Sequence, residues 1–320
     1  MAAVDIAVPT YNCARWLDAF MESVIAQDFT DWRIVTRDDG SVDDTAVMMA
    51  IWRERLGQRV LIIENAENKN LGMIGNYDAV LGACSAERIM LGDPDDVWLP
   101  GKMSMTLHTL NSMERVFGTT CPLVICSDAK VVDERQNTLH TSFWKRMRLK
   151  PATVSDFSRV MMDNPVLTST MLVNRALLVR AVPLSDGGIC PDWWIALVAC
   201  AFGKIVALSE KTILYRRHDD NDSEEPVASS IIGVALRIGV LRKRFVRLIA
   251  RSSGQAAGFK RRFGGVAEQA NIDATNLLVD FAKTGRISVR IKMLVSRVWF
   301  GSLLKTIVLL LIYRSSVDKR

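Results

Sequence analysis

The first two-thirds of the chain alternate short apolar runs with amphipathic helical patterns, and this alternation restricts the possible folds more than any other feature. Apolar runs at residues 5–9, 32–37, 60–65 and 88–91 are typical of strands. From Arg15 to Gln27, apolar residues recur every three or four positions, as on one face of a helix. Strands and helices in this order form βαβ units. The sequence therefore predicts an α/β domain with a mainly parallel, Rossmann-like sheet flanked by helices.

Further elements are expected beyond and between these strands. We expect helices to Leu56, at 73–84, at 99–116 and from near Asp192, and strands at 123–134, 166–173, 204–208 and 212–215. Ser41 and Asp44 have the spacing of a capping arrangement for the helix that runs to Leu56. The stretch 135–160 has weak periodicity and several basic residues, so we interpret it as a mobile loop.

The charge of the chain changes sign near residue 230. Residues 1–230 carry 23 Lys and Arg against 31 Asp and Glu, a net charge of −8, whereas residues 231–320 carry 18 against 4, a net charge of +14. The polar stretch 216–230, which contains Pro226, is typical of a boundary. We therefore expect one domain at 1–228 and a basic helical region at 229–320. Such a split indicates that the two parts face different partners.

The six cysteines show neither a C-x-x-C pair nor a zinc-like spacing. We interpret them as buried, reduced side chains. The first residues lack the basic and apolar regions of a signal peptide, so we expect a cytoplasmic protein.

An acidic segment, GDPDDVW at 92–98, directly follows the strand expected at 88–91. Asp93 and Asp95 stand two apart at the strand end, where open α/β sheets bind ligands. Their hard oxygen ligands favour Mg²⁺ or Mn²⁺, which bridges diphosphate oxygens. Taken alone, such a motif is more often an acidic turn that caps a helix.

Two further polar clusters end the first and second strands, VPTYN at 8–12 and DDGS at 38–41. The carboxyl ends of parallel strands lie on one edge of a sheet, so these clusters are expected beside the acidic segment. Asp38 or Asp39 could accept the imino N–H of a uracil or thymine ring, and Tyr11 could stack on the base.

Taken in order, these segments resemble the family 2 glycosyltransferases, and in particular the bacterial rhamnosyl- and galactosyltransferase-like members. The resemblance covers about residues 4–220. It rests on VPTYN, DDGSVDDT at 38–45, Asn70–Gly72 with Asn76, DPDDVWLPGK at 93–102, TMLVNRALL at 170–178, DWWIAL at 192–197 and YRRH at 215–218. The resemblance implies a GT-A-type fold and an enzyme that transfers a sugar, with inversion, from a nucleotide diphosphate donor.

The resemblance also implies roles for individual positions. It assigns the donor nucleotide to Pro9, Tyr11, Asp38, Asp39, Asn76, Asp93 and Arg216. It assigns the cation to Asp95, with His218 and Asp93, and the catalytic base to Asp192. Acceptor-side candidates are Trp193, Trp194 and Thr168, the last of which stands where the family usually has glycine.

The chemistry of inverting transfer agrees with these roles. It needs a general base on the face opposite the leaving group, and a Lewis acid for the departing diphosphate. A neutral imidazole at His218 favours Mn²⁺ over Mg²⁺. Simpler interpretations remain open: Asp192 as a helix cap, His218 as a surface histidine, and Trp193 and Trp194 as core residues.

The basic region contains amphipathic patterns at 234–249, 266–282 and 289–313. Its uncharged run from Thr306 to Tyr313 is far shorter than the roughly 20 apolar residues of a spanning helix. We expect interfacial helices that meet anionic lipid headgroups. The alternative is a helical cap packed on the catalytic domain. The apolar content of the region argues against nucleic acid.

The sequence thus predicts a peripheral enzyme on the inner face of the cell membrane. It would move a sugar from a UDP- or dTDP-sugar, with Mn²⁺ or Mg²⁺, to a glycan or lipid-linked acceptor in surface polysaccharide synthesis. One alternative is a catalytically silent, membrane-attached nucleotide-sugar-binding module. Another is a nucleotide-sugar pyrophosphorylase, which would be expected to carry a glycine-rich phosphate loop after its first strand. The stretch VPTYNCARW at 8–16 has no glycine.

Overall fold

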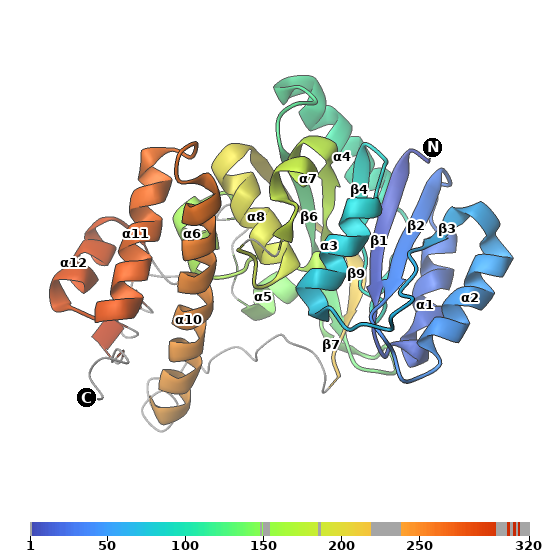
Figure 1. Ribbon diagram of the computed structural model, residues 1–320, viewed down its shortest axis with the longest axis horizontal. Coiled ribbons are helices and arrows are strands. Elements are labelled where there is room, and N and C mark those ends of the chain that lie inside the picture. Colours follow the sequence, from blue (N-terminus) through green and yellow to red (C-terminus); the bar gives the residue numbers. More distant parts are fainter. Residues whose placement is uncertain are drawn as a thin grey trace.

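A computed structural model of the chain describes residues 2–147, 149, 154–184, 187–218, 238–298, 306–307, 310–311 and 313. Helices cover both faces of one sheet, and the C-terminal helices form a further layer at one end of it (Figure 1). The predicted α/β architecture with a C-terminal helical region is confirmed. The expected boundary at residue 228, with Pro226, lies outside the described residues.

The N-terminal half of the sheet is parallel, in the order β3-β2-β1-β4. Its strands are β1 (Val4–Thr10), β2 (Trp32–Asp38), β3 (Val60–Ile62) and β4 (Arg88–Leu91). The connecting helices are α1 (Ala14–Ile25), α2 (Thr45–Leu56) and α3 (Gly72–Ala83), with a 3-10 turn η1 (Gly57–Arg59). This half follows the predicted pattern closely.

Burial on both faces explains the apolar centre of β1. Ile6, Ala7 and Val8 are fully buried, because helices cover both sides of a parallel sheet. Pro9 is tolerated in this central strand because β4 pairs with β1 only as far as Ala7. The missing N–H of Pro9 therefore costs no ladder hydrogen bond on that side.

The other half of the sheet mixes parallel and antiparallel pairs. Its strands are β5 (Val97–Trp98), β6 (Leu123–Val132), β7 (Thr138–His140), β8 (Leu172–Asn174) and β9 (Lys204–Arg216). β8 pairs antiparallel with both β4 and β6, and β9 pairs parallel with β6 and antiparallel with β5. The runs 204–208 and 212–215, expected as two strands, form one strand. The register shift after Ser127 in β6 absorbs the polar residues between them.

Three local predictions are wrong. The stretch 135–160 is not simply a loop, because it contains β7, α5 (Phe143–Met147) and the start of α6 (Phe157–Met162). In 166–173, only the end joins a strand, since η3 (Thr168–Thr170) precedes β8. Ser41 and Asp44 do not form the expected cap, because the Ser41 hydroxyl donates to Asp38 and Asp44 makes no side-chain capping bond.

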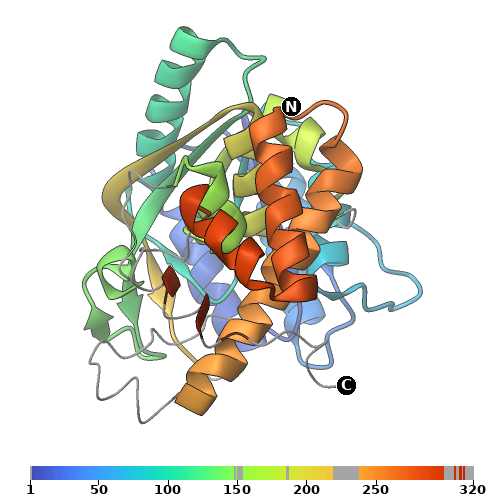
Figure 2. The ribbon, with the colours of Figure 1, turned by 90° about the vertical axis from the view of Figure 1, so that its left-hand side faces the viewer.

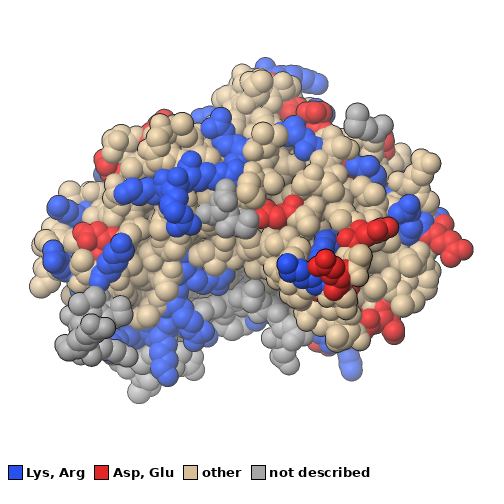
Figure 3. All heavy atoms as spheres, in the orientation of Figure 1, with Lys and Arg blue, Asp and Glu red and all other residues tan. Residues whose placement is uncertain are grey.

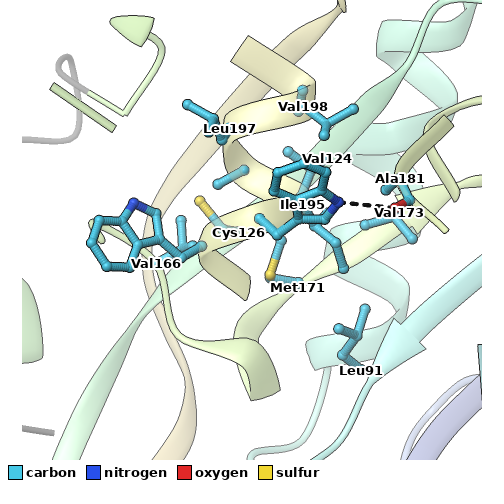
Figure 4. Packing of buried hydrophobic residues seen from close by; sticks show 14 of the residues in the cluster. Leu91, Val124, Cys126, Val166, Met171, Val173, Ala181, Ile195, Leu197 and Val198 are labelled. Carbon is cyan, nitrogen blue, oxygen red and sulfur yellow. Dashed lines mark hydrogen bonds between the residues drawn. The ribbon is translucent and has the colours of Figure 1, made fainter. Parts of the chain in front are cut away.

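The remaining helices of this domain are α4 (Lys102–Phe117), α7 (Arg175–Ala181) and α8 (Pro191–Phe202). Pro191 occupies the first turn of α8, where its missing N–H has no partner to lose. The body of α8 is apolar on all sides and lies in the core. Figure 4 shows Ile195, Leu197 and Val198 of α8 beside Val124, Cys126 and Val173 of the sheet.

The C-terminal helices are α10 (Ile238–Phe263), α11 (Gln269–Thr284) and α12 (Ile287–Val295). α10 packs against α8: Phe263 stacks on Trp194 with ring centroids 6.1 Å apart, and Phe259 stacks on Phe202 at 6.2 Å. α11 lies along α10 (Figure 2). The packed-cap alternative therefore describes α10. Within the described ranges, no helix combines the length and apolar character needed to cross a bilayer.

Candidate active site

The loops that follow β1 and β2 are joined by hydrogen bonds. The backbone N–H of Asn12 donates to the Ser41 hydroxyl at 2.8 Å, and the backbone N–H of Val42 donates to the side-chain oxygen of Asn12 at 2.9 Å. The Cys13 N–H donates to the Thr45 hydroxyl at 2.8 Å. Asn12 has a φ of 46°, a left-handed conformation that asparagine tolerates better than most residues. The two predicted polar clusters therefore form one rigid edge.

Asp39 is almost fully buried, at 2% exposure, and is held by three donors. Its carboxylate accepts from Arg37 Nη1 at 2.5 Å and from the N–H groups of Leu71 and Gly72 at 2.8 Å each. Two of these donors lie where α3 begins, where the N–H groups have no partners within the helix. Asp39 therefore fixes the start of α3 against the end of β2.

Asn76 is also buried, and its side chain faces the protein. Its amide donates to the carbonyl oxygens of Thr10 and Arg37, at 3.3 and 3.2 Å, and its oxygen accepts from Arg37 at 3.1 Å. These bonds hold the ends of β1 and β2 together. The geometry gives Asn76 a positioning role rather than the expected contact with the nucleotide.

Tyr11 and Asp38 are the accessible members of the same edge. The Tyr11 side chain is 52% exposed, so its ring is open to a ligand. Asp38 is partly exposed and accepts from the Ser41 N–H and hydroxyl, at 2.9 and 2.6 Å. Pro9 is partly buried within β1 and shapes the strand end.

Tyr77 contacts one of the predicted acidic residues and lies within the electrostatic reach of two others. Its hydroxyl donates to Asp93 Oδ1 at 2.6 Å. Burial, followed by the charges of Asp93, Asp192 and Asp95, raises the pKa of Tyr77 well above its usual value. Burial and the charge of Asp95 raise the pKa of Asp93 to about 7, and Asp192 adds to this rise. Asp192, from the first turn of α8, therefore shares one electrostatic environment with the acidic segment after β4.

Asp95 pairs with His218 on the other side of this cluster. His218 Nε2 lies 3.0 Å from Asp95 Oδ2, although 123 residues separate them in the chain. The imidazole also stacks on Trp16, with ring centroids 5.7 Å apart. The His218 side chain is mostly buried, which argues against a surface histidine.

Arg216 lies in the same corner of the site. Its guanidinium lies 4.2 Å from the centre of the Trp16 ring, and its backbone N–H donates to Asp96 at 3.2 Å. Its Nε and Nη2 atoms are buried without a hydrogen-bond partner among the described residues. Burial lowers the pKa of Arg216, and the charges of Asp96 and Asp95 oppose that change. Free, buried N–H groups beside carboxylates suit an incoming oxyanion.

The acidic residues of the site fit a divalent cation that takes its remaining ligands from outside the protein. Among the residues that the structure describes, no three His, Cys, Asp or Glu side chains form a metal site by themselves. Nevertheless, Asp93, Asp95 and Asp96 crowd together, and burial with their mutual repulsion raises the pKa values of Asp93 and Asp96. A divalent cation would relieve this repulsion, so the residues fit one.

Trp193 and Trp194 are wrong as acceptor-stacking candidates. Both rings are buried in the core. The Trp194 indole N–H donates to the Ala181 carbonyl at 2.9 Å, drawn as the dashed line at Ala181 in Figure 4, and the Trp193 indole donates to the Val160 carbonyl. Neither ring can meet a sugar. Thr168 is partly exposed in η3, and its neighbour Ser169 accepts from the Trp98 indole at 3.3 Å.

Sequence reasoning missed Tyr77, Trp16 and Arg37. Trp16 belongs to the apolar face of α1, so its position beside His218 left no signal in the sequence. Tyr77 gave a weak signal, because a tyrosine on the buried face of a helix needs a partner for its hydroxyl. Arg37 stood beside the DDGS cluster and looked like an ordinary strand residue.

Fold and site together define a GT-A-type glycosyltransferase. Staphylococcus aureus TarS 1–349, solved in complex with UDP-GlcNAc, shares the fold: its TM-score is 0.51, its sequence is 17% identical, and the match covers 97% of this chain and 91% of that one. The chain belongs to glycosyl transferase family 2, whose family model matches residues 5–164. It is therefore a transferase enzyme, and this membership sets aside the pyrophosphorylase alternative.

Two sequence relatives extend the comparison. An uncharacterised glycosyltransferase from Nostoc sp. is 25% identical over 259 residues, which cover 77% of this chain and 76% of that protein. The Escherichia coli protein WfaP is named as a UDP-Glc:α-D-GlcNAc-diphosphoundecaprenol β-1,3-glucosyltransferase. It is 31% identical over 117 residues, 37% of this chain and 44% of that protein.

Proposed function

We propose that the protein transfers a sugar, with inversion, from a nucleoside diphosphate donor to a hydroxyl group of a lipid-linked glycan. One observation carries this proposal: Asp93 accepts from the Tyr77 hydroxyl, the charges of Asp95 and Asp192 act on the same hydroxyl, and His218 pairs with Asp95. A silent binding module would not require Asp192 in this cluster. Its presence there supports catalysis.

The nucleoside would lie along the edge formed by β1 and β2. Tyr11 would stack on the base, and Asp38 or Asp39 would accept its imino N–H. Asp38 can do so without rearrangement because it is partly exposed. Asp39 already accepts three hydrogen bonds, but a carboxylate has about four lone-pair sites and can accept one more. A uracil or thymine ring fits such an acceptor.

The diphosphate would lie between the acidic segment and the end of β9. Asp95 and His218, with Asp93 beside them, would hold Mn²⁺ or Mg²⁺, and donor oxygens and water would complete the coordination. When bound, the cation would stabilise the negative charge of the departing diphosphate. Arg216 would donate its unpartnered N–H groups to the same phosphate oxygens.

Asp192 would take the proton from the acceptor hydroxyl as that oxygen attacks the sugar. The carboxylate stands at the N-terminal turn of α8. Its Oδ1 accepts from the Trp193 N–H at 2.7 Å, which orients the group. Thr168 would border the acceptor from η3.

The acceptor class is inferred from relatives and from charge. The named acceptor of WfaP carries a diphosphate and a long isoprenoid. The region 231–320 of this chain is strongly basic, and Figure 3 shows Lys and Arg side chains gathered over α10 and α11. We therefore propose that residues 1–228 form the catalytic domain. Residues 229–320 would bring it to the inner, anionic face of a membrane.

Donor hydrolysis by the purified protein tests the proposed function. A panel of nucleotide sugars is incubated with Mn²⁺, with Mg²⁺ or with EDTA, and release of the nucleoside diphosphate is measured. We expect one donor to be hydrolysed only when a cation is present, and Asp95→Ala to abolish this activity. Asp273→Asn on the exposed face of α11 is the control. Undiminished, EDTA-resistant activity of Asp95→Ala would refute the cation assignment.

Asp192→Asn separates catalysis from donor binding. The substitution keeps the size of the side chain and removes the base, so thermal stabilisation by the donor should persist while sugar transfer is lost. If donor affinity falls as strongly as turnover, Asp192 has a structural role and the silent-module alternative gains support.

A further inference from the structure

α10 crosses the segment that leads into Asp192 at very close range. A Cβ atom added to Gly258 would lie 2.3 Å from the Cα atom of Gly187, and one added to Gly187 would lie 2.8 Å from the Cα atom of Gly258. Only two glycines permit so close an approach of two backbones. This contact therefore holds α10 beside residues 187–190, which lead directly into the start of α8.

The same face of α10 carries an arginine toward the site. Residues 251, 254 and 258 follow one another at spacings of three and four, so they share one face of the helix. A Cβ atom added to Gly254 would lie 3.8 Å from Cδ1 of Ile189, which extends the contact by one turn. The next turn in this direction brings Arg251 toward Cys190.

Electrostatics agree with this placement of Arg251. Burial and the nearby Asp192 carboxylate raise the pKa of the Cys190 thiol, and the positive charge of Arg251 opposes that rise. Arg251 is therefore close to the residue that lies two positions before the proposed base. Within the described part of the chain, this partly buried guanidinium makes no hydrogen bond or ion pair. A cation in such a position suits an anion supplied by a ligand.

The donor already has cationic groups of its own. Arg216 and His218 come from the end of β9, where the acidic segment and Trp16 meet them. Arg251 instead comes from α10 and stands on the side of the base. The N-terminal half of α10 projects on the side of the molecule where β1 and β2 end (Figure 1), and it carries Arg244 and Arg247 at the preceding turns.

We propose that Arg251 binds the phosphate of the acceptor, so that the acceptor sugar lies between this guanidinium and Asp192. The proposal rests on the proposed function for the acceptor class, and it deepens that function by assigning a phosphate-binding residue. A guanidinium offers two parallel N–H groups that match two phosphate oxygens. The phosphate would set how far the reacting hydroxyl stands from the base, and would exclude acceptors that lack this charge.

Binding of farnesyl diphosphate, an isoprenoid diphosphate without a sugar, tests the proposal on the full-length protein. EDTA keeps the cation-dependent donor site silent, and calorimetry measures the dissociation constant. Arg251→Gln should weaken binding about tenfold or more, and Arg251→Lys should give an intermediate loss. The control Lys260→Gln removes the same charge from an exposed position about 13 Å further along α10 and should change binding less than about twofold.

Each other outcome counts against the proposal. Equal losses in Arg251→Gln and Lys260→Gln would indicate diffuse attraction to a basic surface. No binding by the wild-type protein, or unchanged binding by Arg251→Gln, would overturn it directly. Vesicles of phosphatidylglycerol distinguish a lipid headgroup as the source of the phosphate. If Arg251→Gln weakens vesicle binding as much as farnesyl diphosphate binding, the acceptor assignment is wrong.

Donor hydrolysis keeps this test separate from that of the proposed function. Arg251→Gln should keep the wild-type KM for the donor in Mn²⁺, because the donor would bind through Arg216 and the acidic segment. A protein that binds farnesyl diphosphate through Arg251 but hydrolyses no nucleotide sugar would contradict the proposed function alone. Matching thermal unfolding midpoints of the two glutamine variants show that the helix remains folded.

Discussion

Asp39, Arg37 and Asn76 form a buried polar network beneath the expected nucleotide edge. Its contacts join the ends of β1 and β2 to each other, to the start of α3 and to the loop before that helix. Buried networks of this kind are stable only when each member is satisfied. The network therefore fixes the strand ends on which the donor would lie, so disrupting it should change both the stability of the protein and donor binding.

Asn76→Ala should destabilise the protein and weaken donor binding together. The substitution removes the amide donor to the carbonyl groups of Thr10 and Arg37 and takes an acceptor from the buried Arg37 guanidinium, which costs about 1–3 kcal/mol in the free energy of unfolding. Urea unfolding and donor-dependent thermal shifts measure the two effects. Asn276→Ala on α11 is the control and should change neither. Full stability of Asn76→Ala would mean that the network is dispensable.

Lys102 is a second buried group that makes a prediction about pH. Its side chain is fully buried, and its Nζ has no hydrogen-bond partner in the described part of the chain, although it lies 4.6 Å from the centre of the Trp98 ring. Burial lowers the pKa of Lys102 from 10.5 to about 7, and the charge of Asp96 opposes this change. Above pH 7 the unfolded chain therefore holds a proton that the folded chain has lost.

Stability should rise with pH in this window, because the unfolded state binds more protons than the native state. Relative to Lys102→Met, the wild type should gain about 1–2 kcal/mol in the free energy of unfolding between pH 7.0 and 8.5. Urea unfolding at both pH values measures the difference. A constant difference between the two proteins would show that Lys102 keeps its proton in the folded state.

At the scale of elements, the contact between α10 and residues 187–190 depends on the identity of two residues, Gly187 and Gly258. Gly258→Ala should push the two backbones apart, because the new methyl group has no space. We expect a loss of about 1–3 kcal/mol in the free energy of unfolding, or more if the helix cannot shift. Gly265→Ala is a matched control, since nothing lies within 4 Å of its Cβ position. Equal stability of the two variants would argue against the crossing.

The N-terminal elements were predictable because local pattern and tertiary role agree there. The apolar residues of β1 and β2 are buried on both faces, and the polar clusters after them fall at the strand ends as expected. The same reasoning brought Asp93 and Asp95 to that edge. These residues required only the rule that parallel strands end on one side of a sheet.

The second half was harder to predict because long-range pairing decides it. β8 has three residues, and only its antiparallel partners β4 and β6 make it a strand. Trp193 and Trp194 follow a catalytic candidate, but α8 is apolar on all sides and its rings turn inward. The contact of His218 with Trp16 joins residues that are 202 positions apart. No local pattern encodes such a distance.

At the scale of the whole molecule, α12 presents an apolar stripe to solvent. Ile287, Ile291 and Val295 recur every four residues, and each is more than half exposed. The exposed residues Arg286, Lys292 and Arg297 lie around the stripe. Aliphatic side chains bordered by cations are typical of a surface that meets anionic lipid. This stripe is where we expect the proposed membrane contact.

Ile291→Asp should reduce binding to phosphatidylglycerol vesicles about tenfold. It removes apolar area that the membrane would bury, and it adds a negative charge that anionic headgroups repel. Val116, near the end of α4, is also more than half exposed, and Val116→Asp should leave vesicle binding unchanged. Co-sedimentation measures both. Equal pelleting of the two variants would contradict attachment through α12. Point substitutions are preferable to removal of residues 231–320, because that deletion would also uncover Trp194 and Phe202.

The paired glycines at 187 and 258 also have a consequence for hybrid enzymes. A chimera of two relatives with its junction between these positions takes one position from each parent. If either parent carries a larger residue there, its side chain would push α10 away from residues 187–190. Working chimeras should inherit both positions from the same parent. A chimera should consequently acquire the acceptor preference of a relative only when it takes both residues 187–190 and α10 from that relative.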